Sequence, residues 1–348
     1  MKYLKNFCTC VVGSLVSVVA VAQQLSEVIY ESPSEEFINL SLQTYNNKLR
    51  FGMQHNYYVN TDGSFVDNSG EAYATAEKRT SHNVLSRHAF IELLKIRFQE
   101  EIFSVMDRNL LTKRTQNMYD KELKSYTAQQ QVLTLANTLS TKTQKRKFFC
   151  NDKQEDCASK FPENGYYSIP RDVLGWAGRG ASEFQQLRAY RAFVKERFPA
   201  IQQWGNELHK ENSIEGYFVG RIRLGEYDFE NEGYWLNLDA FQNTDFLLRW
   251  SYFQPSNTAE RILASPKGCQ ILLKLSPEEA EKLAENHQFL LMGFSVVVSL
   301  KGIENYRSNQ LKTLFSLTSS KIQIFKDDGL TQKVSEIDIN SMITKTRY

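Results

Sequence analysis

One stretch constrains the fold of this 348-residue chain more than any other, because residues 82–140 contain neither proline nor glycine. Apolar side chains recur there at the spacing of an amphipathic helix, namely Leu85, Ala89, Leu93, Ile96, Ile102, Val105 and Met106. The pattern thins over residues 112–117 and then resumes. A single amphipathic rod of this length would need a partner to cover its apolar stripe. The sequence therefore predicts two long helices folded as a hairpin.

The segments on either side of this stretch also carry helix signals. Ser32-Pro33-Ser34-Glu35 has the layout of a capping box, so we predict a short helix from Ser32 to about Asn46. A β-hairpin is predicted for residues 57–66, around the turn at 60–63. Residues 141–181 are polar and rich in loop signals, after which Ser182 can begin a helix. Pro199 should end that helix and start another, since proline disfavours helical geometry in the residue before it.

From Ile214 onward the chain is predicted to be rich in β-strands. Phe218, Ile222 and Leu224 alternate with polar residues, but after Gly225 the large apolar residues move to the other parity. Such a change needs a bulge or bend, and glycine is where the backbone can supply it. Asn231-Glu232-Gly233 is predicted to form a turn into a strand at 234–238. Further strands are predicted at residues 246–253, 269–275, 289–300, 311–317, 321–325 and about 334–337. A capping box at Ser276 predicts a helix to about Asn286.

These patterns together predict an α+β protein: a helical N-terminal half with a long helical hairpin, followed by a mainly antiparallel β-rich domain with one short helix. The expected organisation is a signal peptide at 1–22, a helix-and-hairpin segment at 23–81, a helical region at 82–212 with a loop-rich junction at 141–181, and the β-rich domain at 213–348.

The N-terminus has the layout of a cleavable signal peptide. Lys2 and Lys5 precede an apolar run that ends in Ala20-Val21-Ala22, and this run is shorter than a spanning helix requires. We therefore expect an exported protein, periplasmic or extracellular, with no transmembrane segment after cleavage. Removing residues 1–22 would leave 40 basic and 40 acidic residues. A neutral chain lacks the basic footprint of a nucleic-acid-binding protein, so no nucleic-acid partner is predicted.

Three cysteines remain after the predicted cleavage site. Cys150 and Cys157 flank a short polar loop, and in an oxidising compartment they can form a disulfide. The alternative is two free thiols. Their spacing does not match a zinc site, and neither a metal nor a cofactor is predicted. Cys269 stands at the head of an apolar run, which indicates a buried thiol.

Three acidic residues are the only catalytic candidates that the sequence offers. Glu226, Asp228 and Glu230 alternate along one predicted strand, so they would project from one face and could act as a general acid and base. The same alternation is typical of a solvent-facing strand whose intervening residues Tyr227 and Phe229 are core. We favour the solvated strand.

Two further residues are candidates for binding. Trp235 is predicted to point away from the face that Tyr234 and Leu236 occupy, so it is either covered by the helical region or part of a recognition surface. Arg179 lies in the glycine-rich segment 175–180 before the helix at Ser182. It could assist anion binding at that helix N-terminus, or the segment could be a flexible connection.

No catalytic signature stands out in the sequence, although residues that are distant in the chain can still meet in a fold. We predict a non-catalytic binding or protein-interaction module of the bacterial cell envelope, with an unknown protein or envelope polymer as its partner. The alternative is an envelope hydrolase that acts on glycan or peptide through paired carboxylates.

Overall fold

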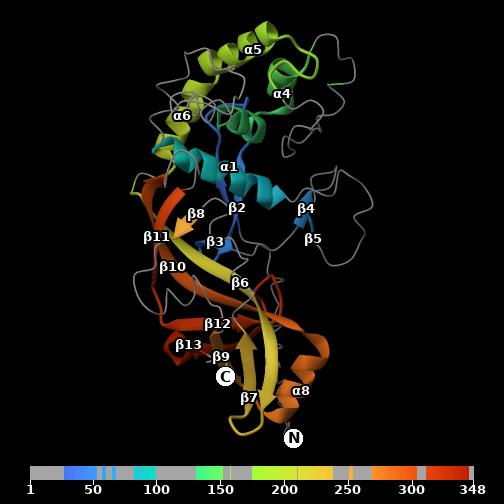
Figure 1. The fold of residues 1–348 in the computed structure, drawn as a ribbon, viewed down its shortest axis with the longest axis vertical. Helices are drawn as coiled ribbons and strands as arrows, with labels where there is room; N and C mark the ends of the chain where they lie inside the picture. Colours follow the sequence, from blue (N-terminus) through green and yellow to red (C-terminus); the bar gives the residue numbers. More distant parts are fainter. Residues whose placement is uncertain are drawn as a thin grey trace, which may run out of the picture.

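The computed structural model describes residues 27–52, 57–59, 65–67, 82–98, 131–151, 157, 175–209, 211–237, 251–253, 269–303 and 311–344. These residues form an elongated β-rich structure (Figure 1). Its main element is a mixed sheet of twelve strands, and a separate two-stranded sheet pairs β4 (Tyr57–Val59) with β5 (Phe65–Asp67). Most of the helices gather at one end of the long axis, and a β-hairpin projects at the other end beside one further helix.

Two long antiparallel strands run along the molecule and connect its ends. β6 (Ser213–Asp228) and β10 (Phe289–Ile303) pair from Arg223 opposite Phe289 to Ser213 opposite Ser299. The first half of β6 pairs in parallel with β3 (Lys48–Gly52), and its second half pairs with β7 (Gly233–Asn237). β10 likewise pairs with β11 (Leu311–Leu317) and with β12 (Lys321–Phe325). Each long strand therefore pairs with one strand in its first half and with a different strand in its second half, which connects the two ends of the sheet.

The remaining strands extend these pairings. β1 (Glu27–Tyr30) pairs with β2 (Leu40–Tyr45), which in turn pairs with β3. β8 (Ser251–Phe253) runs parallel to β11, and β13 (Lys333–Asp338) pairs with β12. β9 (Cys269–Lys274) lies between β7 and β14 (Ile343–Thr344), which follows a short 3-10 helix, η4 (Ile339–Ser341).

Glycines let large aromatic side chains lie flat on the two long strands. A Cβ atom at Gly293 of β10 would stand 2.4 Å from the Tyr217 hydroxyl oxygen, and one at Gly216 of β6 would stand 2.3 Å from the Phe51 ring. Tyr217 thus crosses β10 and donates a hydrogen bond of 2.7 Å to Gln323 Oε1 on β12. Side chains from strands that are not direct neighbours are joined in this way.

The helices cover the β1–β3 end of the sheet (Figure 1). α1 (His82–Ile96) packs against β2 and α6 (Phe198–Glu207). A Cβ atom at Gly205 of α6 would lie 2.8 Å from the Leu93 carbonyl oxygen, so glycine permits this close approach. Residues 131–139 are helical and bury Val132, Leu135 and Leu139 in the same core. α4 (Lys142–Phe149) and α5 (Glu183–Glu196) complete the helical end.

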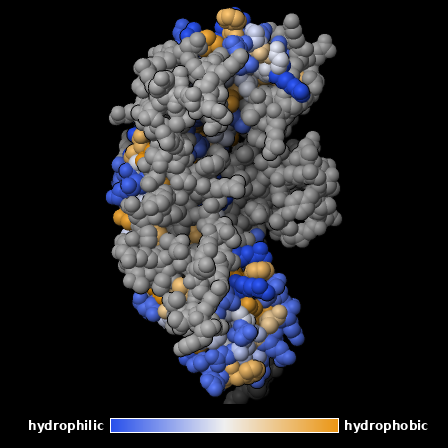
Figure 2. Space-filling model, in the orientation of Figure 1, coloured by the Kyte–Doolittle hydropathy of each residue, from blue (hydrophilic) through white to orange (hydrophobic). Residues whose placement is uncertain are grey.

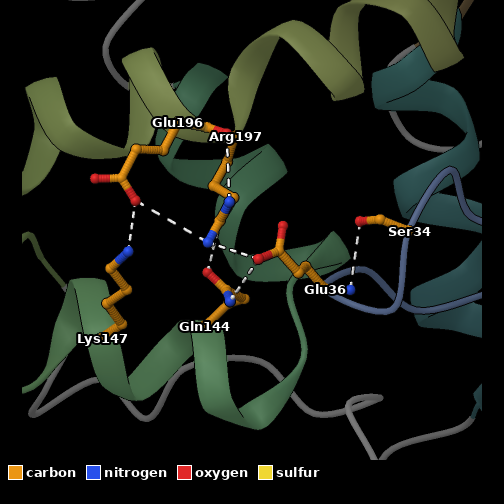
Figure 3. Close-up of polar contacts among 6 residues, drawn as sticks. All are labelled: Ser34, Glu36, Gln144, Lys147, Glu196 and Arg197. Carbon is orange, nitrogen blue, oxygen red and sulfur yellow. Dashed lines mark hydrogen bonds and ion pairs between the residues drawn. The ribbon is translucent and has the colours of Figure 1, made fainter.

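A polar network holds the helical end together (Figure 3). Arg197, between α5 and α6, forms an ion pair of 2.6 Å with Glu36 and donates a hydrogen bond of 2.9 Å to Gln144 Oε1 on α4. Lys147 of α4 pairs with Glu196 of α5 at 2.5 Å. Segments that are more than 100 residues apart in the chain are therefore joined by side chains, as the Gln144–Glu36 separation of 108 residues shows.

The predicted helical N-terminal half is wrong, since residues 27–52 form β1, β2 and β3. No helix forms from Ser32 to Asn46, because Ser34 accepts a turn hydrogen bond from the Phe37 amide and the chain then enters β2. Leu40-Ser41-Leu42-Gln43 alternates apolar and polar residues as a strand does, yet all four are buried in β2. Asn46 and Asn47 have positive φ values of 51° and 62°, which form the two-residue turn of a β-hairpin.

The predicted long helical hairpin over residues 82–140 is not what the structure shows. α1 ends at Ile96, and the next described helical residues are 131–139, while residues 99–130 lie outside the described ranges. Among the described elements, α1 packs on β2 and on α6. The apolar spacing that predicted the hairpin thus reflects burial of a shorter helix against the sheet.

Other local predictions are confirmed. Ser182 begins α5 and Ser276 begins α8 (Pro277–Asn286), each through a complete capping box. α6 carries a proline in its first turn. The β6–β7 pairing shifts register between Leu224 and Tyr227, which places the bulge at Gly225. The β4–β5 hairpin also forms. The domain boundaries, among them the junction at 141–181, stay predictions.

Candidate functional site

The β6–β7 hairpin projects from the end of the molecule opposite the helices (Figure 1). Glycines permit the local geometry: a Cβ atom at Gly225 would lie 2.1 Å from the Trp235 carbonyl oxygen, and one at Gly233 would lie 2.5 Å from the Leu273 carbonyl oxygen. Glu232 adopts a positive φ of 50° in the turn between the two strands. The sequence thus bends β6 at Gly225 and reverses the chain before Gly233.

Asp228 organises the hairpin turn. Its Oδ1 accepts hydrogen bonds from the backbone amides of Glu230 at 2.9 Å and Asn231 at 3.0 Å. Its Oδ2 accepts from Asn231 Nδ2 at 2.8 Å and from Trp235 Nε1 at 3.1 Å. The bonds from Asn231 and Trp235, with that from the Glu230 amide, lower the pKa of Asp228 to about 2. The carboxylate is therefore ionised at neutral pH, and its four hydrogen bonds hold the turn in place.

Three aromatic rings form a connected array beside this turn. The Tyr227 ring meets the Phe229 ring edge-on at a centroid distance of 4.9 Å and the Tyr234 ring at 5.1 Å. The Tyr227 hydroxyl donates to the Leu275 carbonyl at 3.0 Å, so its position is fixed. Phe229 is 80% exposed, the largest value among the exposed large hydrophobic residues of the described chain. A rigid support thus presents one apolar ring to solvent.

Acidic residues surround this array. Glu226, Glu230 and Glu232 are exposed on the hairpin, and α8, which contacts β7, exposes Glu278, Glu281 and Glu285. Desolvation and the negative charges of Glu232 and Glu278 raise the pKa of Tyr227, so acids of both elements lie near the ring. In Figure 2 this end of the molecule shows hydrophobic and hydrophilic residues side by side. We name the surface made by the β6–β7 hairpin and α8 the hairpin end.

The three candidate carboxylates do not share one environment. Glu226 and Glu230 are exposed, whereas the Asp228 carboxylate accepts four hydrogen bonds from the turn and from Trp235. A general acid must hold a proton near the working pH, and a pKa of about 2 is unsuited to that role.

The expectation that Phe229 is core is wrong, since its ring is exposed. The sequence feature that could have indicated this exposure is the position of Phe229 close to the Asn231-Glu232-Gly233 turn.

The two candidate binding residues lie at opposite ends of the molecule. Trp235 is half-buried at the hairpin end, and its indole supports the turn through Asp228. Arg179 is exposed near the start of α5. There the first-turn amide of Gln185 is already bonded to the Ser182 hydroxyl at 3.3 Å. The roles of Trp235 in recognition and of Arg179 in anion binding stay predictions.

The predicted disulfide is confirmed: Cys150 and Cys157 are joined, and their Cα atoms lie 5.7 Å apart. Cys269 is a buried free thiol, as predicted. The bridge follows directly on Phe149, whose ring stacks on Trp176 at 5.0 Å in the core of the helical end. The disulfide thus ties the residues after α4 to this aromatic core.

Within the described ranges, no group of three or more His, Cys, Asp or Glu side chains is placed to hold a metal ion. None of the described helices has the length and apolarity needed to cross a membrane. Comparisons with family models, with curated proteins and with solved structures gave no significant match.

Proposed function

We propose that this chain is an exported, non-catalytic interaction protein of the bacterial cell envelope, and that its hairpin end contacts a protein partner. The observation that supports this proposal most directly is Phe229: a large apolar ring, 80% exposed, on a turn fixed by four hydrogen bonds to Asp228. Aromatic side chains that are held rigidly lose little conformational entropy on binding, and they dominate interface energetics.

The surroundings of Phe229 favour a protein over an anionic membrane. The exposed acids Glu226, Glu230 and Glu232 lie on the same hairpin as the ring, and negatively charged lipid headgroups would repel them. A protein surface with an apolar socket and a basic rim would complement both features. Export is proposed from the N-terminal layout, and the Cys150–Cys157 disulfide supports it because such bonds persist in oxidising compartments.

The hydrolase alternative is less well supported. It requires two carboxylates that can exchange a proton, and Asp228 is committed to the turn with a depressed pKa. Glu226 and Glu230 are exposed on the surface of the hairpin. No observation in the described residues favours hydrolysis over binding.

The proposal is tested by site-specific photo-crosslinking in the cells that make the protein. A benzophenone side chain replaces Phe229 in one variant and Ile29 in a matched control, since Ile29 is also an exposed large hydrophobic residue. We expect one discrete adduct from position 229 and none from position 29. Equal labelling from both positions, or none from 229, would contradict the proposal.

A further inference from the structure

The two ends of the molecule carry matching stripes of opposite charge. On α5 the residues Arg188, Arg191 and Lys195 are all exposed, and their spacing of three and then four residues places them on one helix face. On α8 the residues Glu278, Glu281 and Glu285 are exposed at the same spacing, with the exposed Lys282 beside them. Each stripe is about 10 Å long, the rise of seven helical residues.

An exposed aromatic residue continues each stripe at the same end. Phe184, one turn before Arg188 on the same face of α5, is 75% exposed. Glu278 begins the acidic stripe, and it lies close enough to Tyr227 to raise the pKa of that tyrosine. Tyr227 in turn contacts the exposed Phe229. In both stripes the aromatic ring therefore lies near the N-terminal end of the helix, and the charged residues follow it along the helix.

The two stripes cannot meet within one molecule. α5 lies at the helical end and α8 at the opposite end of the long axis (Figure 1). None of Arg188, Arg191 and Lys195 forms a salt bridge with another residue in the described ranges. Among the described residues, neither stripe is covered by one of opposite charge, and a second molecule would supply that surface.

We infer that the partner at the hairpin end is a second copy of this chain, whose α5 stripe packs on the α8 stripe with the helices aligned in parallel. Arg188 would face Glu278, Arg191 would face Glu281, Lys195 would face Glu285, and Phe184 would meet the ring of Phe229. The inference rests on the proposed function, because it names the partner of the same surface. The contact joins two different surfaces, so it leaves one end of each copy open to a further molecule.

The contact is expected to be weak and sensitive to salt. Exposed ion pairs contribute little individually and are screened by added ions. Sedimentation velocity of the mature chain should therefore show concentration-dependent association at about 20 mM salt and a monomer at about 500 mM.

Two variants test the geometry of the contact. Arg188→Gln with Arg191→Gln removes the basic stripe, and Glu278→Gln with Glu281→Gln removes the acidic stripe while keeping the Glu279 capping box. Each variant alone should sediment as a monomer, with at least a tenfold loss of affinity. Their mixture should form a 1:1 dimer and nothing larger, because one intact basic end then meets one intact acidic end. Lys301→Gln with Lys321→Gln, two exposed cations outside the stripe, should leave association unchanged.

Several results would overturn the second copy as partner: a monomeric wild-type chain at low salt, association of either neutralised variant alone, or no dimer in the mixture. Adsorption of the α5 stripe to anionic vesicles without self-association would also overturn it. An adduct between position 229 and a different protein, with a monomeric wild-type chain, would reject the second copy while the proposed function stands. No adduct and no self-association would reject both.

Discussion

The helical end and the hairpin end are both organised by polar side chains, but over very different distances along the chain. At the helical end Arg197 joins Glu36 and Gln144, and these residues come from segments that are far apart in the sequence. At the hairpin end Asp228 bonds only to groups within seven residues of itself. The long-range network ties the core together, whereas the local one shapes a surface. Removing comparable groups at the two ends should therefore have unequal effects.

Removal of an aromatic ring gives the largest expected contrast. Phe149 is fully buried and stacks on Trp176, so Phe149→Ala should lower the free energy of unfolding by about 3–5 kcal/mol. Phe229→Ala should change it by less than about 0.5 kcal/mol, because an exposed ring contributes little to the fold. Denaturant unfolding of both variants measures the contrast. Similar losses at the two positions would show that the hairpin end is part of the core.

The two ends also differ in how well the sequence predicts them, because local signals can be recognised in a sequence and long-range contacts cannot. The bulge at Gly225 and the capping boxes at Ser182 and Ser276 could be predicted because their signals are local. β2 was missed because the apparent capping box at Ser32 favoured a helix, although Leu40-Ser41-Leu42-Gln43 alternates apolar and polar residues. Its pairing to β3 was signalled by Asn46-Asn47, a turn that the apparent helix start at Ser32 obscured.

The candidate site was predicted only in part. The sequence selected Asp228 and Trp235 but could not show that they bind each other, since that contact depends on how the hairpin closes. Exposure of Phe229 was missed because strand alternation places Tyr227 and Phe229 on one face, whereas the turn ends the strand at Asp228. The charged stripes on α5 and α8 could not be interpreted from the sequence, because it does not show that the two helices lie at opposite ends of the fold.

Loss of the long-range network should have an intermediate effect. Arg197→Met removes the ion pair with Glu36 and the hydrogen bond to Gln144, and the Arg197 side chain is only 19% exposed. We expect a loss of about 1–2 kcal/mol in the free energy of unfolding. Arg191→Met, at an exposed position on α5, is the matched control and should be nearly neutral. Equal values for the two variants would mean that the network does not hold the helical end.

The smallest expected effect is the response of the hairpin to acid. The pKa of Asp228 is lowered from 3.8 to about 2, so its contribution is complete above the unfolded value and is lost as the pH falls through about 2. The indole N–H resonance of Trp235, assigned with Trp235→Phe, should shift with a midpoint near that value while the chain stays folded. A midpoint near 3.8 would mean that Asp228 makes no such bonds, and Asp228→Asn should abolish the transition.

The most direct test of the central claim, that the hairpin end is an interaction surface, is hydroxyl-radical footprinting of Phe229. Labelling is compared between the purified mature chain in about 500 mM salt and the same chain in intact envelopes, with exposed Ile29 as the internal reference. The account predicts strong labelling of Phe229 in the purified chain and protection in the envelope, with Ile29 unchanged. Equal labelling of Phe229 in both settings would contradict it.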